Sequence, residues 1–167
     1  MCGIVGYVGP REATSILVDG LRRLEYRGYD SAGIAVLGED GIVRVTRSEG
    51  KLGNLTARIE AEPPAGRTGI GHTRWATHGR PSEENAHPHR DATGRVVVIH
   101  NGIIENFLPL KRDLLARGIP FTSETDTEVI AQAIGAARAD APGAPFAGVV
   151  RSVLARMTGM YAVVVLS

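Results

Sequence analysis

A chain of 167 residues with 43% hydrophobic and 22% charged residues has the length and composition of one globular domain with a sizeable core. Its net charge of +1, spread over scattered arginines and carboxylates, predicts no nucleic-acid partner. The N-terminus lacks the pattern of a signal peptide, and the longest apolar run is too short to cross a bilayer, so we expect no membrane partner and a cytoplasmic location. The single cysteine excludes an internal disulfide and suits a reducing compartment.

Strands and helices are predicted in clusters along the chain rather than in strict alternation. The strands are expected at Gly3–Val8, Ala32–Leu37, Ile42–Thr46, Gly69–Thr73, Val96–His100 and Met160–Leu166. The helices are expected from Pro10 to Leu24, at Leu52–Ile59, Ile104–Arg117, Thr127–Ala139 and Phe146–Met157. This order favours a mixed α+β fold with hairpins over a doubly wound parallel sheet.

The most informative residue is Cys2, the only cysteine, which directly follows Met1. Methionine is normally removed when a small residue follows it, and its removal would leave Cys2 with a free α-amine beside its thiol. The amine titrates near ~8 and the thiol near ~8.5, so the amine can accept the thiol proton. Such an amine is a recognised base for an N-terminal nucleophile. The alternative is a buried cysteine that packs as a small hydrophobic residue.

The five histidines all lie between His72 and His100, which makes a histidine-based metal-binding domain a competing hypothesis. None has the i, i+4 spacing of a helical metalloprotease site, and the only cysteine is at the terminus. The chain also lacks a dinucleotide fingerprint and a phosphate-binding loop. We therefore expect structural or substrate-shaping histidines, and no metal or organic cofactor.

The segment His72–Gly79 leaves a predicted strand and carries Arg74, Trp75, Thr77 and His78. An arginine can bind a carboxylate through two parallel hydrogen bonds, and the other groups can complete a small polar pocket. The alternative is an ordinary strand end with a surface arginine and a packed tryptophan.

The segment His100–Asn106 also leaves a strand, and it contains Asn101 followed by Gly102. A side-chain amide beside an exposed backbone N–H makes a two-donor oxyanion hole. The alternative is an ordinary turn, because Asn-Gly is a common turn dipeptide.

The segment Ser123–Glu128 is rich in carboxylates and resembles a helix N-terminus, with Thr125 or Asp126 as the N-cap. A carboxylate here can bind an ammonium group. The alternative is that Asp126 only caps the helix.

Five segments together resemble one family. They are Cys2–Tyr7 (CGIVGY), Leu24–Gly33 (LEYRGYDSAG), Thr73–Gly79 (TRWATHG), His100–Asn106 (HNGIIEN) and Thr122–Glu128 (TSETDTE). In this order and composition they resemble the glutaminase domain of class II glutamine amidotransferases, within the N-terminal-nucleophile hydrolases. The resemblance implies a four-layer αββα sandwich with Cys2 at the end of a central strand.

The resemblance also implies hydrolysis of L-glutamine to glutamate and ammonia through a thioester on Cys2. Asn101 and Gly102 would hold the oxyanion. Arg74 would bind the substrate α-carboxylate and Asp126 its α-ammonium. Trp75 would close over the substrate, with Thr77 and His78 completing the pocket. No cofactor is implied.

Within the family, the residues around Tyr26–Asp30 and Trp75–Thr77 match the branch that uses fructose 6-phosphate as the ammonia acceptor. This match implies separate sugar-isomerase domains and a homodimer for the full-length enzyme. Nothing in this chain corresponds to those domains. Two alternatives stay open: a domain of the phosphoribosyl pyrophosphate branch, and an inactive glutamine-binding module that retains Met1.

The last segment, Met160–Ser167, predicts a buried strand that stops without a turn. The family's domain continues through further strands that would pair with this region. We therefore expect residues 1–167 to be a C-terminally incomplete glutaminase domain with an exposed β-branched edge.

Overall fold

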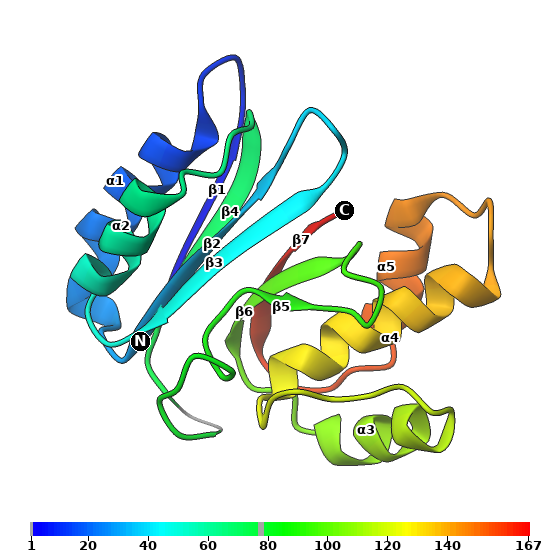
Figure 1. Ribbon diagram of the computed structural model, residues 1–167. Helices are drawn as coiled ribbons and strands as arrows, with labels where there is room; N and C mark the ends of the chain where they lie inside the picture. Colours follow the sequence, from blue (N-terminus) through cyan, green and yellow to red (C-terminus); the bar gives the residue numbers. More distant parts are fainter. Residues whose placement is uncertain (1, 77–78) are drawn as a thin grey trace.

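The first two layers of the fold are a pair of helices and a four-stranded antiparallel sheet (Figure 1). The structure is a computed structural model, which describes residues 2–76 and 79–167. The strands in sheet order are β1 (Gly3–Val8), β4 (Thr68–Arg74), β2 (Ser31–Leu37) and β3 (Val43–Glu49). The helices α1 (Ala13–Leu24) and α2 (Leu52–Ala61) cover the outer face of this sheet.

The other two layers are a second antiparallel sheet and the helices that cover it. Its strands in sheet order are β5 (His89–Arg90), β6 (Val97–Gly102) and β7 (Tyr161–Leu166). Three helices lie on the side away from the first sheet: α3 (Phe107–Ala116), α4 (Asp126–Asp140) and α5 (Phe146–Leu154). The expected four-layer αββα architecture is confirmed.

Alternation along the strands explains why the sheets stack in this way. In β2, Ile34 and Val36 belong to the apolar cluster under α1 and α2, whereas Ala35 belongs to the cluster between the two sheets. In β6, Val97 and Ile99 lie between the sheets. Because successive side chains of a strand point to opposite faces, each sheet has two apolar faces and must be covered on both.

The described strand order differs from one expectation. The family resemblance implied a central strand for Cys2, but β1 pairs only with β4 and stands at an end of the order in the described residues. The prediction of a central strand is therefore wrong for this part of the chain.

The helix predicted from Ile104 starts later, at Phe107. Residues before it bond to a distant segment instead: the backbone N–H of Glu105 donates to the Thr158 carbonyl oxygen at 2.9 Å. The later start also places Pro109 in the first turn, where a missing N–H costs no helical hydrogen bond. Similarly, α1 begins at Ala13 rather than Pro10.

Two short elements were not predicted, the strand β5 and the 3₁₀ turn η1 (Glu25–Arg27). Each is only two or three residues long, too short to show a hydrophobic period. Within the part of the chain that the structure describes, no helix has the length and apolar character needed to cross a membrane.

Gly33, in the middle of β2, provides a test of how closely the segment before β5 approaches the first sheet. A methyl group at this position would lie 2.2 Å from the His87 carbonyl oxygen and 2.9 Å from that of Thr46. Backbone atoms cannot move aside cheaply, so we expect Gly33→Ala to lower the free energy of unfolding by about 1–3 kcal/mol. Urea unfolding measures this change.

Gly6→Ala is the matched control, because Gly6 also lies in a strand of this sheet but has nothing within 4 Å of an added methyl group. We expect this variant to be as stable as the parent or slightly more stable. Equal losses in the two variants would contradict the close approach of the His87 backbone.

Candidate active site

The thiol of Cys2 lies at the end of β4, because β1 and β4 run antiparallel and Gly3 pairs with Thr73. The backbone N–H of Trp75 donates to Cys2 Sγ at 3.2 Å, and the thiol donates to the Trp75 carbonyl oxygen at 3.5 Å. Cys2 is half-buried, so it is not packed away as a core residue. The turn after β4 therefore fixes the position of the sulfur.

Burial raises the pKa of the Cys2 thiol, because a thiolate loses solvation there. The N–H of Trp75 opposes this shift, since it stabilises the thiolate. Desolvation is the larger effect. A nucleophile at this position therefore needs a base that removes its proton.

Asn101 reaches Cys2 from the other sheet. Its Nδ2 donates to the Cys2 carbonyl oxygen at 3.2 Å. Asn101 and Gly102 are the last two residues of β6, so the alternative of an ordinary turn is wrong. Gly102 has a φ of +114°, and a Cβ there would lie 2.1 Å from the Met160 carbonyl oxygen. Only glycine fits this backbone position, which lines the same cavity as Cys2.

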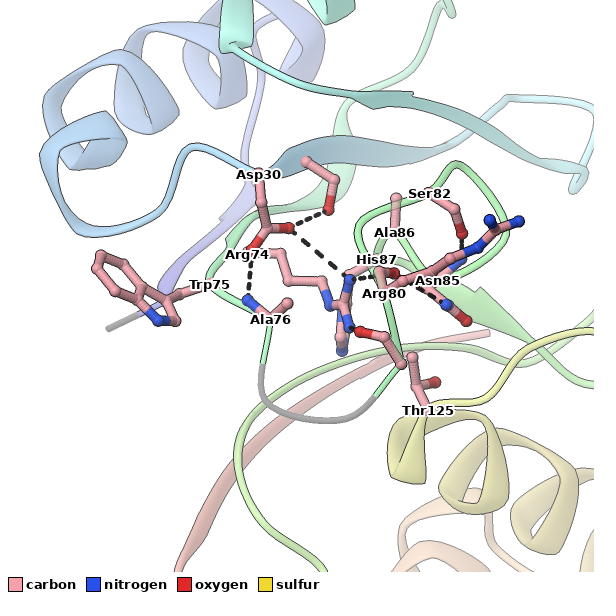
Figure 2. A network of polar contacts seen from close by, with 12 residues as sticks. Asp30, Arg74, Trp75, Ala76, Arg80, Ser82, Asn85, Ala86, His87 and Thr125 are labelled. Carbon is pink, nitrogen blue, oxygen red and sulfur yellow. Dashed lines mark hydrogen bonds and ion pairs between the residues drawn. The ribbon is translucent and has the colours of Figure 1, made fainter.

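Arg74, the last residue of β4, is 3% exposed and therefore not a surface arginine. Its Nη1 lies 3.7 Å from Asp30 Oδ1, and its Nη2 donates to the Gly79 carbonyl oxygen at 2.9 Å. The other carboxylate oxygen of Asp30 accepts from the backbone N–H of Ala76 (Figure 2). Asp30 thus holds both the guanidinium and the chain that follows it.

Trp75 points away from the Arg74 network (Figure 2) and is 47% exposed. Its ring makes an edge-to-face contact with Tyr29, with 5.4 Å between the ring centroids. Trp75 is therefore packed on one side only, against Tyr29, and the rest of its ring remains accessible. The predicted pocket residues Thr77 and His78 lie outside the described residues.

Asp126 is the first residue of α4 and is 4% exposed. The N-cap is Thr125, whose side-chain oxygen accepts from the Glu128 N–H at 3.3 Å. Asp126 Oδ2 accepts instead from the Ile104 N–H at 2.9 Å. Its Oδ1 lies 4.0 Å from His100 Nδ1. Asp126 is therefore not the helix cap, and a carboxylate is held in place among the residues that surround the thiol.

These side chains line one cavity of about 460 Å³. Six of the predicted site residues line it: Cys2, Arg74, Trp75, Asn101, Gly102 and Asp126. The lining also contains Arg27, His87, His100, Ile103, Thr125 and Thr127, to which the sequence had assigned no binding role. Arg27, Ile103, Thr125 and Thr127 nevertheless lie inside the segments that carry the family resemblance, and the clustering of the histidines had left a substrate-shaping role open for His87 and His100.

The buried histidines form a connected group next to the cavity. The rings of His72 and His87 stack with 4.1 Å between centroids. Thr127 Oγ1 lies 2.7 Å from His87 Nε2 and 2.9 Å from His100 Nδ1. Burial lowers the pKa of His72 to about 4 and that of His87 well below its ordinary value, so both rings are neutral near pH 7.

Among residues 2–76 and 79–167, no three His, Cys, Asp or Glu side chains are grouped so that they could hold a metal ion. The described histidines that face the cavity bond to Thr127 instead. These contacts fit either of the two roles expected for the histidines, structural or substrate-shaping.

A comparison with known protein families matches residues 72–167 to the glutamine amidotransferase domain. The chain belongs to this family. Similar curated proteins include glutamine–fructose-6-phosphate aminotransferases (isomerizing) from Thermus thermophilus, 57% identical over 99% of this chain, and Pyrococcus horikoshii, 54% identical over 99%. The chain spans about a quarter of their length, 26% and 27% respectively.

Solved structures of this amidotransferase fold are also similar. The glutamine phosphoribosylpyrophosphate amidotransferase of B. subtilis, complexed with ADP and GMP, has a TM-score of 0.83 and 26% identity, covering 100% of this chain and 35% of that one. A structure described as the allosteric regulatory enzyme of purine biosynthesis has a TM-score of 0.84 and 27% identity, covering 99% and 35%.

The environment of the thiol predicts how this amidotransferase domain reacts with iodoacetamide. Because folding raises the pKa of the Cys2 thiol, we expect the alkylation rate to reach half its maximum at a higher pH in the folded chain than in the same chain unfolded in urea. The chain has one cysteine, so both profiles report the same thiol. A folded profile shifted to lower pH would contradict a dominant effect of burial.

Proposed function

We propose that this domain hydrolyses L-glutamine to glutamate and ammonia, with Cys2 as the nucleophile after removal of Met1. The observation that carries the proposal is the meeting of the two sheets at the thiol. There the Asn101 carboxamide lies beside Cys2, and its Nδ2 donates to the Cys2 carbonyl oxygen at 3.2 Å. A nucleophile and a fixed N–H donor on one cavity wall are the two parts that acyl transfer needs most.

The reaction begins when the α-amine of Cys2 takes the thiol proton and Sγ attacks the side-chain carbonyl carbon of glutamine. The carbonyl electron pair moves to oxygen, where Asn101 Nδ2–H and the Gly102 N–H stabilise the negative charge. The tetrahedral intermediate then collapses: the C–N bond breaks, the amine proton passes to the leaving nitrogen, and ammonia departs. Water cleaves the resulting thioester, which releases glutamate and restores the thiol.

Recognition of glutamine uses the two buried charges of the cavity. Arg74 binds the α-carboxylate of the substrate, and Asp30 keeps the guanidinium in place while it does so. Asp126 binds the α-ammonium, because its carboxylate lies in the cavity wall and the helix cap is supplied by Thr125. Trp75 closes over the bound substrate, and Thr77 and His78 complete the pocket. The reaction uses no metal or organic cofactor.

The acceptor of the ammonia is proposed from the relatives. Residues 1–167 are the glutaminase part of a longer protein whose sugar-isomerase domains combine ammonia with fructose 6-phosphate. Identities of 51–57% to aminotransferases named for that acceptor favour it over phosphoribosyl pyrophosphate, since the two solved structures are only 26–27% identical. We further propose a cytoplasmic homodimer for the complete protein.

Covalent labelling tests the nucleophile. Incubation with a glutamine analogue that carries an electrophilic γ-ketone should add one molecule, at Cys2, in protein whose intact mass shows that Met1 is absent. Cys2→Ser should lose almost all glutamine hydrolysis, because an alcohol is much harder than a thiol to deprotonate with a weak amine base. Hydrolysis at the parent rate by protein that retains Met1 would refute the mechanism.

The charge of Asp126 is tested with Asp126→Asn. Asparagine keeps an oxygen that can accept from the Ile104 N–H, but it removes the charge that would bind the substrate ammonium. We expect kcat/KM for glutamine to fall by the equivalent of roughly 2–5 kcal/mol, the cost of removing one partner of a buried charge pair.

Asp140→Asn is the matched control for this variant. Asp140 is the last residue of α4, and its side chain is exposed, where it pairs with Arg117. We expect Asp140→Asn to leave kcat/KM unchanged. If both variants retain the parent value, Asp126 has only a structural role.

A further inference from the structure

His72 makes a contact that the mechanism above does not use. It lies in β4 with 0% of its surface exposed, and its side chain shares a face of the strand with Ile70, which packs between the sheets. His72 Nε2 lies 2.9 Å from Asn101 Oδ1 and 3.1 Å from the His100 carbonyl oxygen. A carbonyl oxygen can only accept, so both contacts are hydrogen bonds when Nε2 carries the proton.

The Asn101 side chain is thereby held at both ends. Its Oδ1 accepts from His72, and its Nδ2 donates to the Cys2 carbonyl oxygen at 3.2 Å. Rotating the carboxamide by 180° would set its NH₂ against the His72 N–H and its oxygen against the Cys2 oxygen. Both contacts would then be repulsive, so the two hydrogen bonds select one orientation of the amide.

The surroundings of His72 favour the same proton position. The ring is buried and stacked on His87, and burial lowers its pKa to about 4, so it is neutral near pH 7. A neutral imidazole has one donor and one acceptor nitrogen. The other nitrogen, Nδ1, has no hydrogen-bond partner within the described residues. Moving the proton to Nδ1 would lose two hydrogen bonds and gain none in this part of the chain.

We propose that His72 is the positioning residue of the oxyanion site, which fixes the Asn101 carboxamide with its NH₂ turned toward Cys2. The proposal rests on the oxyanion-binding role proposed for Asn101. His72 touches neither the substrate nor the sulfur in this role. It acts by preventing the amide from presenting its oxygen, which would repel the developing negative charge instead of stabilising it.

Two variants of His72 distinguish the loss of its hydrogen-bond donor from the loss of its side-chain volume. His72→Leu removes the donor, and we expect kcat for glutamine to fall by about 10²–10³, the loss seen when one oxyanion donor is removed, while KM changes little. His72→Gln retains a side-chain N–H at a similar reach, and we expect it to recover most of the lost rate. Equal losses in the two variants, or a parent kcat in His72→Leu, would overturn the proposal.

Alkylation of Cys2 by iodoacetamide is the control for general damage to the site. Displacement of iodide at a saturated carbon develops no oxyanion, so the alkylation rate of His72→Leu should stay within about twofold of the parent. If the alkylation rate falls as much as kcat, His72 supports the fold of the site rather than the orientation of Asn101.

A double-mutant cycle tests whether His72 acts through Asn101. In an Asn101→Ala background, the carboxamide is absent, so His72→Leu should lower kcat no further. A loss of 10²–10³ that persists in this background would overturn the proposal.

Nitrogen NMR of the parent chain gives a readout that does not depend on activity or on a variant that folds. The proposal requires the His72 proton on Nε2, and a proton on Nδ1 would overturn it. If the parent chain without Met1 fails to hydrolyse glutamine, the proposed function is wrong. The tautomer of His72 still shows in that case whether His72 holds the Asn101 amide.

Discussion

Face-to-face packing of the two sheets is the constraint on which the cavity depends. Val97 and Ile99 of β6 pack against Ala35 and Ile70 of the first sheet, in an apolar layer that holds the strands at a fixed separation. This layer brings the end of β6 to the start of β1. The hydrogen bond from Asn101 to Cys2 forms where these strand ends meet, so its geometry is set by core packing rather than by a loop.

Two buried charged groups near this junction, Arg74 and Asp126, are held by other groups of the fold. Arg74 has Asp30 and the Gly79 carbonyl oxygen, and Asp126 has the Ile104 N–H. Burying such groups without partners would cost several kcal/mol each, roughly 2–7 even for uncharged ones. Fixing them beforehand means that little reorganisation is left for the moment when a charged ligand enters.

Most of the strand layout could be predicted from the sequence, because short continuous apolar runs mark β2 and β6 without knowledge of their neighbours. The motifs also gave six of the residues that line the cavity. What the sequence could not give was their pairing: Asp30 binds the Ala76 N–H from 46 positions away, and no local pattern records that contact. Likewise, the sequence predicts a turn at Asn101-Gly102. A glycine with positive φ is typical of a turn, but here Gly102 has its positive φ at the end of a strand. The contact of His72 with Asn101 depends on sheet packing, which periodicity does not encode.

The wide separation of the site residues along the chain has a consequence for folding. Cys2 contacts Trp75 from 73 positions away and Asn101 from 99 positions away. Closing the long loops between these residues costs chain entropy before the contacts form, so we expect the site to form late in folding. During synthesis the ribosome must release the chain beyond Asp126 before the cavity can close. Until then the N-terminus stays accessible to any enzyme that acts on an unfolded chain.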